Sequence, residues 1–500
     1  MKEVKKSFSD LLFIYLANIF AIPLMLVSEA FQGRYLKVDD YGMVSLILSF
    51  ISLVYFFSFS WMGYSILRFG KVEYDEHNHL HKVNTSFLII NSFLLILTII
   101  LYFIFEKTIL DFFNITQNFS FRIVIILGFI LLFLKNYIFQ LLKTINHLKH
   151  HSFLDRILPK FLICIFILLL ALIIKKFNVL NIILIFLFTD LFIIIIGLFY
   201  IKKEYLFPFT IDTKIIKAML LFSLPLFFGS WSNYIIDWID LYAIKYFLTM
   251  NDVGIYSAAY KLFNAGKYII SSGIIAVTVP IIILFKSKNQ TEKIVLYITR
   301  LTPQITLIGF VILSVTVYFI DYLIILIYGN KFEQSITPLK ILIASQAFGF
   351  INYMLSAVLI AYSETRFLSI IGIILALLNL TGDVFLIPLI GYNGASISTM
   401  LVFSINAIII HFFLNRKFRI KRNISLLIST MLLLITFINI VFTSMLGKGL
   451  ITLTLITATV LLCRHYSLFK KSDIELFINI SLPVFVRKLL TNIILILSRN

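Results

Sequence analysis

Amide and carboxylate side chains lie inside long apolar runs of this sequence, where such polar groups indicate ion binding or proton transfer. Asn379 and Asp383 are four residues apart, so a helix places them on one face. With Asp237 and Thr399 they form a set of oxygen ligands that suits Na⁺ or a proton relay. The alternative is a polar cluster between helices, with Lys267 as its counter-charge.

Lysines also lie inside the apolar runs. Lys261 and Lys267 are six residues apart, which places them within roughly 120° of each other around a helix. Lys135, in an earlier run, adds a third donor if all three face one lumen, and together they suit a pyrophosphate or an acidic sugar. The alternative is that these lysines snorkel, or pair with Asp190 or Asp237.

The apolar runs are the elements that must position these groups. Most of the fourteen reach the roughly 20 residues that a helix needs to cross about 30 Å of hydrocarbon, although the fifth and the last are short. They are Leu11 to Phe31, Tyr41 to Leu67, Thr85 to Phe105, Ile123 to Leu142, Phe161 to Ile174, Leu180 to Ile201, Ala218 to Leu241, Gly254 to Phe285, Leu301 to Tyr328, Ile336 to Tyr362, Phe367 to Pro388, Gly391 to Leu414, Ile424 to Leu446 and Gly449 to Leu462. With 60% apolar residues and a mean hydropathy of +1.01, the sequence predicts an all-α polytopic membrane protein.

Basic residues alternate between the two sides of these runs. Assigning the connecting segments alternately to two sides puts 30 Lys and Arg residues on the N-terminal side and 9 on the other, with four inside the runs. Because basic residues stay on the cytoplasmic side during insertion, both termini are expected in the cytoplasm. Most of the formal charge of +19 therefore reflects the orientation of the chain in the membrane, and nucleic acid is not an expected partner. Lys340, near the outer end of its run, is expected to snorkel to the interface.

Cysteine and histidine positions argue against a metal centre. Cys164 and Cys463 lie in or beside separate apolar runs, so they form neither a disulfide framework nor a metal cluster. Two histidine groups have spacings that resemble metal ligands, and acidic residues stand beside the first group. We favour solvated cytoplasmic loops for both over a metal site. The groups are His77, His79 and His81, and His147, His150 and His151.

The sequence offers no soluble catalytic apparatus. It has no Gly-rich phosphate loop, nucleophile elbow or paired catalytic carboxylates on an extramembrane domain. The longest outward connection, from Glu106 to Arg122, leaves little room for an acceptor site. We therefore expect a protein that is not an enzyme, needs no cofactor beyond a possible Na⁺ or H⁺ as coupling ion, and works between its helices.

Two junctions in the sequence are related. One runs from Arg34 to Ser45 and the other from Lys245 to Ser257. Each has a basic residue and Tyr, a short turn, and then Asp-x-Gly-x-x-Ser, which opens the next helix. Six spans separate them, so the two copies have the same orientation and predict parallel repeats about an axis along the membrane normal.

This repeat sets the expected domain boundaries. Residues 1–203 form an N-lobe of helices 1–6, and residues 204–422 form a C-lobe of helices 7–12. Residues 423–466 add helices 13 and 14, and residues 467–500 form a cytoplasmic amphipathic tail. Asp40 and Asp252, which open the second helix of each junction, are expected to cap those helices, with transport chemistry as the alternative.

Four segments carry a family resemblance: the Asp-x-Gly turn, Ser223-Leu224-Pro225, Asp252 to Leu262, and Ile387 to Ser396. In this order and at these spans, the chain resembles the Wzx-type polysaccharide flippases of the multidrug/oligosaccharidyl-lipid/polysaccharide (MOP) exporter superfamily along its whole length. The resemblance implies a V-shaped protein of two six-helix lobes plus two C-terminal helices. It also implies a bacterial cytoplasmic (inner) membrane location.

The resemblance further implies transport of an undecaprenyl-diphosphate-linked oligosaccharide to the outer leaflet by alternating access. The unit would serve O-antigen (lipopolysaccharide) or capsule synthesis, with the pathway's polymerase and chain-length regulator as possible partners. The set Asp237, Asn379, Asp383 and Thr399 resembles the sodium site of the lipid II flippases of this superfamily.

One departure concerns the cargo. The lipid II flippases carry cavity-facing arginines on their first helix, and this chain has none between Leu11 and Phe31, which argues against lipid II as the cargo. The alternatives are a multidrug cation antiporter of the same superfamily and, less favoured, an O-unit polymerase.

Overall fold

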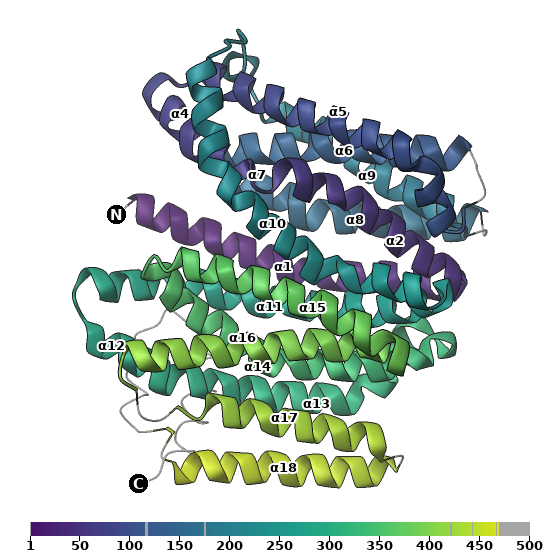
Figure 1. Ribbon diagram of the computed structural model, residues 1–500, viewed down its shortest axis with the longest axis vertical. Helices are drawn as coiled ribbons and strands as arrows, with labels where there is room; N and C mark the ends of the chain where they lie inside the picture. The colour runs from purple at the N-terminus through teal and green to yellow at the C-terminus, as the bar shows by residue number, and fades with distance from the viewer. Residues whose placement is uncertain are drawn as a thin grey trace. The chain divides into compact units, whose positions relative to one another are not determined.

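A computed structural model describes residues 2–115, 119–174, 177–420, 423–442, 444–466 and 468–469 (Figure 1). Within these residues the chain folds into helices and no strand is present. The first half of the chain contains α1 (Lys2–Tyr35), α2 (Val38–Val54), α3 (Gly63–Ser65), α4 (Lys71–His77), α5 (His81–Phe112), α6 (Phe119–Thr144), α7 (Leu148–Ser152), α8 (Leu158–Leu169) and α9 (Val179–Phe199). The second half contains α10 (Thr213–Phe247), α11 (Met250–Ser287), α12 (Thr291–Leu296), α13 (Thr302–Tyr328), α14 (Ile336–Ala361), α15 (Thr365–Ile390), α16 (Asn393–Lys417), α17 (Ser425–Val441) and α18 (Met445–His465).

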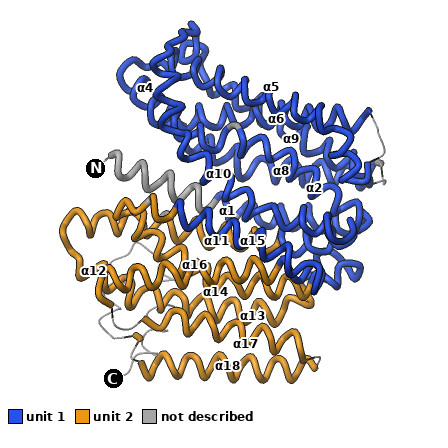
Figure 2. Tube along the Cα trace, in the orientation of Figure 1, with its two compact units in different colours: residues 1–261, 324–335, 369–395 blue, residues 262–323, 336–368, 396–500 orange. Residues whose placement is uncertain are grey.

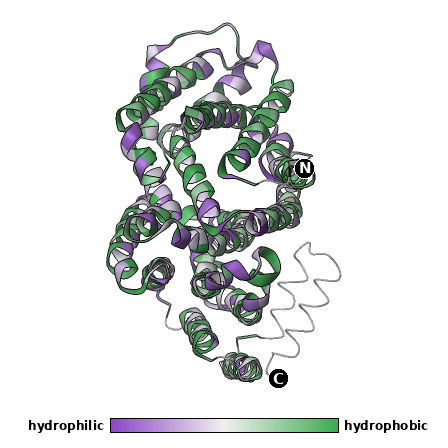
Figure 3. Ribbon diagram, turned by 90° about the vertical axis from the view of Figure 1, so that its right-hand side faces the viewer, coloured by the Kyte–Doolittle hydropathy of each residue, from purple (hydrophilic) through white to green (hydrophobic). Residues whose placement is uncertain are grey.

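Each of the fourteen predicted spans contains helix, which confirms the all-α prediction. The thirteenth span, predicted to reach Leu446, ends at Val441, and the next helix begins at Met445. Among the described residues, twelve helices are long and apolar enough to cross a membrane, and α17 is a shorter apolar helix. Figure 3 shows apolar residues along these helices. Residues 470–500, most of the predicted amphipathic tail, lie outside the described residues.

The fifth span is longer than predicted. Single π-helical turns join shorter α segments, so α7, Phe153–Ile157, α8 and Leu170–Ile174 form one helix. Its membrane-crossing part runs over Leu148–Ile173, whereas the predicted run began at Phe161. The sequence signal was interrupted because Asp155, Arg156 and Lys160 lie in the first half of this helix. Arg156 Nε pairs with Asp155 Oδ2 at 2.8 Å.

By contact density the chain divides into two compact units (Figure 2). Unit 1 comprises residues 1–261, 324–335 and 369–395, and unit 2 comprises residues 262–323, 336–368 and 396–500. Unit 1 thus includes α10, which the repeat assigns to the second lobe, so the predicted lobe boundaries stay a prediction based on the repeat.

The core of unit 1 explains why α10 belongs with it. Phe59, Phe87 and Phe133 form an aromatic cluster, and Met219 of α10 is buried among the same residues. Ser223 of α10 also contacts Met62 Sδ at 3.1 Å. Asp212 caps α10, because its carboxylate accepts hydrogen bonds from the backbone N–H groups of Lys214 and Ile215.

Unit 2 is organised around α14. In the membrane-crossing window of α14, 89% of the residues are buried, more than in any other of the twelve spans. α17 packs along α14 and α18 packs on α17. The hydroxyl of Ser429 on α17 donates to the carbonyl of Ala347 on α14 at 3.0 Å. The two C-terminal helices are therefore built into unit 2.

The prediction that Lys340 snorkels is wrong. Lys340 is 2% exposed, and its Nζ lies 2.5 Å from Asp321 Oδ1. Asp321 also pairs with Lys448 at 3.2 Å, and Lys340 Nζ donates to the carbonyl of Asn439 at 3.2 Å. Because a carboxylate from α13 lies within reach, the ammonium need not extend to the interface.

Candidate functional site

The two repeat junctions lie against each other within unit 1. Asn251 Nδ2 donates to Asp39 Oδ1 at 2.9 Å, which joins the turn before α11 to the first turn of α2. At the start of α11, Asp252 Oδ2 accepts from Thr249 N at 3.0 Å and from Thr249 Oγ1 at 2.6 Å. This confirms the capping role of Asp252. Asp40 lies in the first turn of α2, whose N-cap, Lys37, makes no side-chain capping bond.

A charged cluster of four residues lies next to these junctions and joins four helices of unit 1. Glu29 of α1 is 7% exposed, and its carboxylate accepts from Tyr41 Oη of α2 at 2.5 Å. Lys261 Nζ of α11 lies 3.2 Å from the same carboxylate and 4.1 Å from the centre of the Tyr41 ring. Tyr328 Oη, at the end of α13, lies 3.4 Å from Tyr41 Oη and donates to the carbonyl of Ala258 at 3.3 Å.

The predicted lumen lysines therefore have different surroundings. Lys261 is ion-paired with Glu29, a carboxylate that the sequence pattern did not single out. Lys135 of α6 lies 2.6 Å from Asp190 of α9, so it forms one of the two ion pairs that the sequence allowed. Lys267 belongs to unit 2, where its Nζ lies 5.9 Å from the centre of the Phe403 ring.

Lys160 is a membrane-embedded cation that the hydropathy pattern did not reveal. It lies on α8, near the middle of the fifth span, and α8 packs against α1. Lys160 interacts electrostatically with Glu29, Lys261 and Lys135. A cation among groups of both signs, in the middle of a span, suits a negatively charged ligand more than it suits packing against lipid. The signal was present in the sequence, but the fifth span had been started one residue too late to include it.

The predicted cation ligand Asn379 meets a carboxylate from α10. Asn379 Nδ2 donates to Asp240 Oδ1 at 3.3 Å, and Tyr256 Oη of α11 donates to Asp240 Oδ2. Asn379 is 1% exposed, Asp240 is 2% exposed and Asp383 is fully buried. Tyr256 interacts electrostatically with both Asp240 and Asp383. Three oxygen-bearing side chains from α10 and α15 thus lie around Tyr256, in a region shielded from water.

Asp240 is the member of this cluster that was not predicted. It follows the predicted ligand Asp237 by three residues on α10. Asp237 is half-buried, and its part in ion binding stays a prediction. Thr399 is buried in unit 2, and its part likewise stays a prediction. Within the described parts of the chain, no group of three His, Cys, Asp or Glu residues is arranged to hold a metal ion.

Comparisons with known proteins give a family for the chain and a fold. A family model described as "Polysaccharide biosynthesis protein" matches residues 7–286. The probable low-salt glycan biosynthesis flippase Agl15 of Haloferax volcanii is 26% identical over 194 residues, which are 39% of this chain and 41% of that protein. The match thus spans less than half the length of this relative.

Solved structures resemble the chain over most of its length. Lipid II flippase MurJ in an inward closed conformation matches with a TM-score of 0.68 at 15% identity, covering 91% of this chain and 99% of that one. An inward-facing multidrug resistance MATE family transporter of the MOP superfamily matches with a TM-score of 0.60 at 14% identity, covering 83% and 94%. At these identities the likeness establishes the fold, which is that of the MOP transporters.

Proposed function

The chain belongs to the polysaccharide biosynthesis protein family, and on this premise we propose that it is a flippase for an undecaprenyl-diphosphate-linked oligosaccharide. It moves the lipid-linked unit of an O-antigen or capsule from the cytoplasmic to the outer leaflet of a bacterial cytoplasmic membrane by alternating access. The observation that carries the proposal is the joint match to this family and to a glycan biosynthesis flippase.

The charges inside the helices supply a physical reason. A diphosphate and a sugar head group cannot cross hydrocarbon unaided, because each would lose its hydration. Lys160 and Lys261 place two ammonium groups within the membrane-spanning part of unit 1, and Glu29 partly balances them. Such a region accepts a diphosphate at low cost while the polyprenyl chain stays in lipid.

We assign coupling to the cluster of Asp240, Asn379 and Asp383. Two carboxylates and an amide in a water-poor region bind Na⁺ through their oxygens, or one carboxylate takes up a proton. Tyr256, which donates to Asp240, links this cluster to α11. Since Lys261 is on the same helix α11, occupation of the cluster has a direct mechanical path to the charged region.

Reconstitution tests this function. The full chain is placed in liposomes that carry an undecaprenyl-diphosphate oligosaccharide, and the rate at which the sugar becomes accessible to an external glycosidase is measured with and without a Na⁺ or pH gradient. Faster exposure than in protein-free liposomes supports a flippase, and a response to one gradient identifies the coupling ion. No acceleration with any of a panel of oligosaccharides contradicts the proposal.

The second candidate function is a multidrug cation antiporter. The structural likeness to a MATE family transporter is the observation that favours it. The same liposomes decide between the two functions, because an antiporter exports a cationic dye and leaves the glycosidase rate unchanged. An O-unit polymerase receives no support from the family or its relatives, which are transporters.

A further inference from the structure

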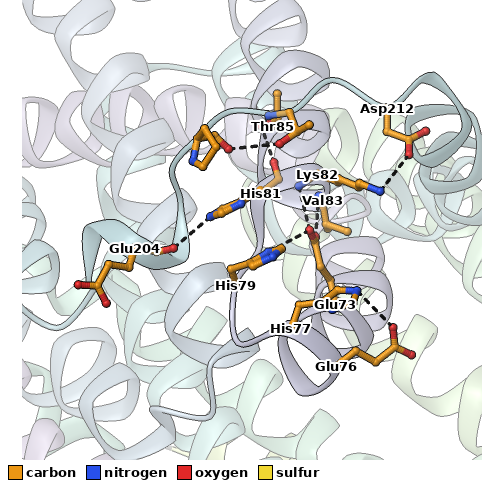
Figure 4. Close-up of polar contacts among 12 residues, drawn as sticks. Glu73, Glu76, His77, His79, His81, Lys82, Val83, Thr85, Glu204 and Asp212 are labelled. Atoms are coloured by element: carbon orange, nitrogen blue, oxygen red, sulfur yellow. Dashed lines mark hydrogen bonds and ion pairs between the residues drawn. The ribbon is translucent and has the colours of Figure 1, made fainter.

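Three histidines outside the membrane helices are not used by the proposed transport. His77 ends α4, His79 lies in the turn that follows, and His81 begins α5 (Figure 4). The rings of His79 and His81 are 3.9 Å apart and within 5° of parallel, and those of His77 and His79 are 5.5 Å apart at 22°. Because the rings lie face to face, their nitrogen atoms do not converge on one point as metal ligands do.

Two of the three rings have a carboxylate partner. Glu76 Oε2 lies 3.8 Å from His77 Nε2, and Glu73 Oε1 lies 3.6 Å from His79 Nδ1. Glu73 is 8% exposed and fixed in place, because its two oxygens accept the backbone N–H groups of the second and third residues of α5 at 2.9 Å each. A proton on either ring is therefore matched by a nearby negative charge.

His81 has a different partner. Among the described residues, no carboxylate lies within ion-pair distance of its ring. Its Nε2 lies 3.1 Å from the carbonyl oxygen of Glu204 (Figure 4). A carbonyl only accepts, so Nε2 carries the hydrogen. His81 thus donates to residues 200–212, the linker that joins α9 to α10.

Further contacts fasten this linker to the start of α5. Leu80 N donates to the carbonyl of Tyr205 at 2.8 Å, and Thr210 N donates to Thr85 Oγ1 at 3.0 Å. The Tyr205 ring also packs edge-on against Tyr74 of α4, with centroids 5.5 Å apart. The linker between the two sequence repeats is therefore clamped at one spot, with His81 at its centre.

We infer that the three stacked rings are a proton-binding site that fastens the linker at Glu204 at neutral pH and frees this contact when a second proton binds. The first proton settles on His79, where Glu73 balances it. A second proton on His81 lies one ring-stacking distance away from the first and has no counter-ion. The repulsion between two charges this close to a protein surface exceeds the net worth of one hydrogen bond to a carbonyl. The His81 ring then swings away from His79 and leaves Glu204.

The other charged groups beside the clamp form ion pairs. Lys71 and Asp75 form an ion pair at 2.6 Å, and Lys82 lies 3.9 Å from Asp212. Burial, together with the hydrogen bond to Tyr205, raises the pKa of Tyr74, so this phenol stays neutral. The Glu204 side chain points away from the stack (Figure 4). Imidazole is the side chain that in general changes charge at mildly acidic pH, and the imidazoles beside the linker contact at Glu204 are those of the stack.

A distance measurement on the whole protein tests the inference. Cys164 and Cys463 are replaced by alanine, and spin labels are attached to Val72→Cys on α4 and Lys203→Cys on the linker, both of which are exposed positions. We expect a narrow distance distribution at pH 7.5 that becomes at least twofold wider at pH 5.5 in lipid nanodiscs. An unchanged width at both pH values overturns the inference, whether or not the protein proves to be a flippase.

Two variants separate the stack from other causes of acid sensitivity. His81→Gln keeps an N–H donor for Glu204 but takes up no proton, and His79→Phe keeps a flat ring without the first charge. Both are expected to stay narrow at pH 5.5, and widening in either one contradicts the inference. His465→Gln, at an exposed position that ends α18 in unit 2, is the matched control and should widen as the parent does. Widening on addition of EDTA at pH 7.5 would mean that a bound metal holds the linker, and that result also overturns the inference.

Discussion

Gly42 and Gly254, the matching glycines of the two repeat junctions, are packed against each other. A Cβ on Gly42 would lie 2.7 Å from the backbone nitrogen of Gly254 and 2.6 Å from the carbonyl oxygen of Met250. A Cβ on Gly254 would collide with the carbonyl oxygen of Val38. Val38 and Met250 each precede the local glycine by four residues, so the contact is reciprocal, as a local two-fold relation requires.

This contact predicts that alanine is not tolerated at Gly254. The Cβ must displace backbone atoms, and such overpacking costs about 1–3 kcal/mol. Gly254→Ala is expected to lower the apparent Tm of the protein in detergent by several degrees. The control is Gly266→Ala in the same helix, where no atom lies within 4 Å of the added Cβ. Because alanine favours helix by about 1 kcal/mol over glycine, Gly266→Ala should not lower the Tm. Equal apparent Tm values for Gly254→Ala and Gly266→Ala would mean that the packing of Gly42 against Gly254 has room for a methyl group.

The coupling cluster predicts which carboxylates respond to the ion. Asp240→Asn and Asp383→Asn should each weaken the stimulation by a Na⁺ or pH gradient at least tenfold, because each removes a negative charge from a buried cluster. The glycosidase assay in liposomes measures this stimulation, and Asp111→Asn, at an exposed position, is the control. Asp237→Asn decides between the two α10 positions. If it alone abolishes the response, the ligand predicted from the sequence is correct and Asp240 is structural.

Lys160 is expected to contribute to cargo binding. Lys160→Met should weaken binding of undecaprenyl diphosphate about tenfold, which is about 1.4 kcal/mol, because it removes a cation from the membrane-embedded region near Lys261. Native mass spectrometry of the purified protein with the lipid provides the affinity. Lys288→Met, at an exposed position, should bind as the parent does. The same affinity in both variants would exclude Lys160 from the site.

The triad of Asp321, Lys340 and Lys448 predicts a non-additive effect on stability. Asp321→Asn leaves a buried ammonium without its carboxylate, and removal of one partner of a buried pair costs about 3–5 kcal/mol. The double variant Asp321→Asn, Lys340→Met should recover part of this loss, which a double-mutant cycle on apparent unfolding free energies measures. Lys448→Met should cost less, since Asp321 keeps its shorter contact to Lys340. Strict additivity would show that the pair does not interact.

The positions of the helices could be predicted from the sequence because hydropathy is a local property. All fourteen predicted spans contain helix, and the repeat junctions that were recognised from spacing prove to be in contact. Asn379 and Asp383 were found because a four-residue spacing on one helix fixes their common face.

The partners of these residues depend on which helices meet, and one sequence does not contain that information. Asp237 and Asp240 are three residues apart, and only the position of α15 singles out Asp240 as the partner of Asn379. Lys340 was misassigned because Asp321 lies on another helix. Lys160 was excluded from its span because the charges around it lower the local hydropathy, whereas the packed protein supplies their counter-charges.

The burial of α14 has a consequence for the biosynthesis of the chain. Its mean hydropathy of 1.5 is among the lowest of the twelve spans, and it carries Lys340, so by itself it is one of the weaker membrane segments. α17, which covers it, begins at Ser425, more than 60 residues after α14 ends. A ribosome must therefore complete most of the protein before α17 can pack on this segment and separate it from lipid. Chains that stop after α16 should be recognised by membrane quality control and degraded, even though they contain both sequence repeats.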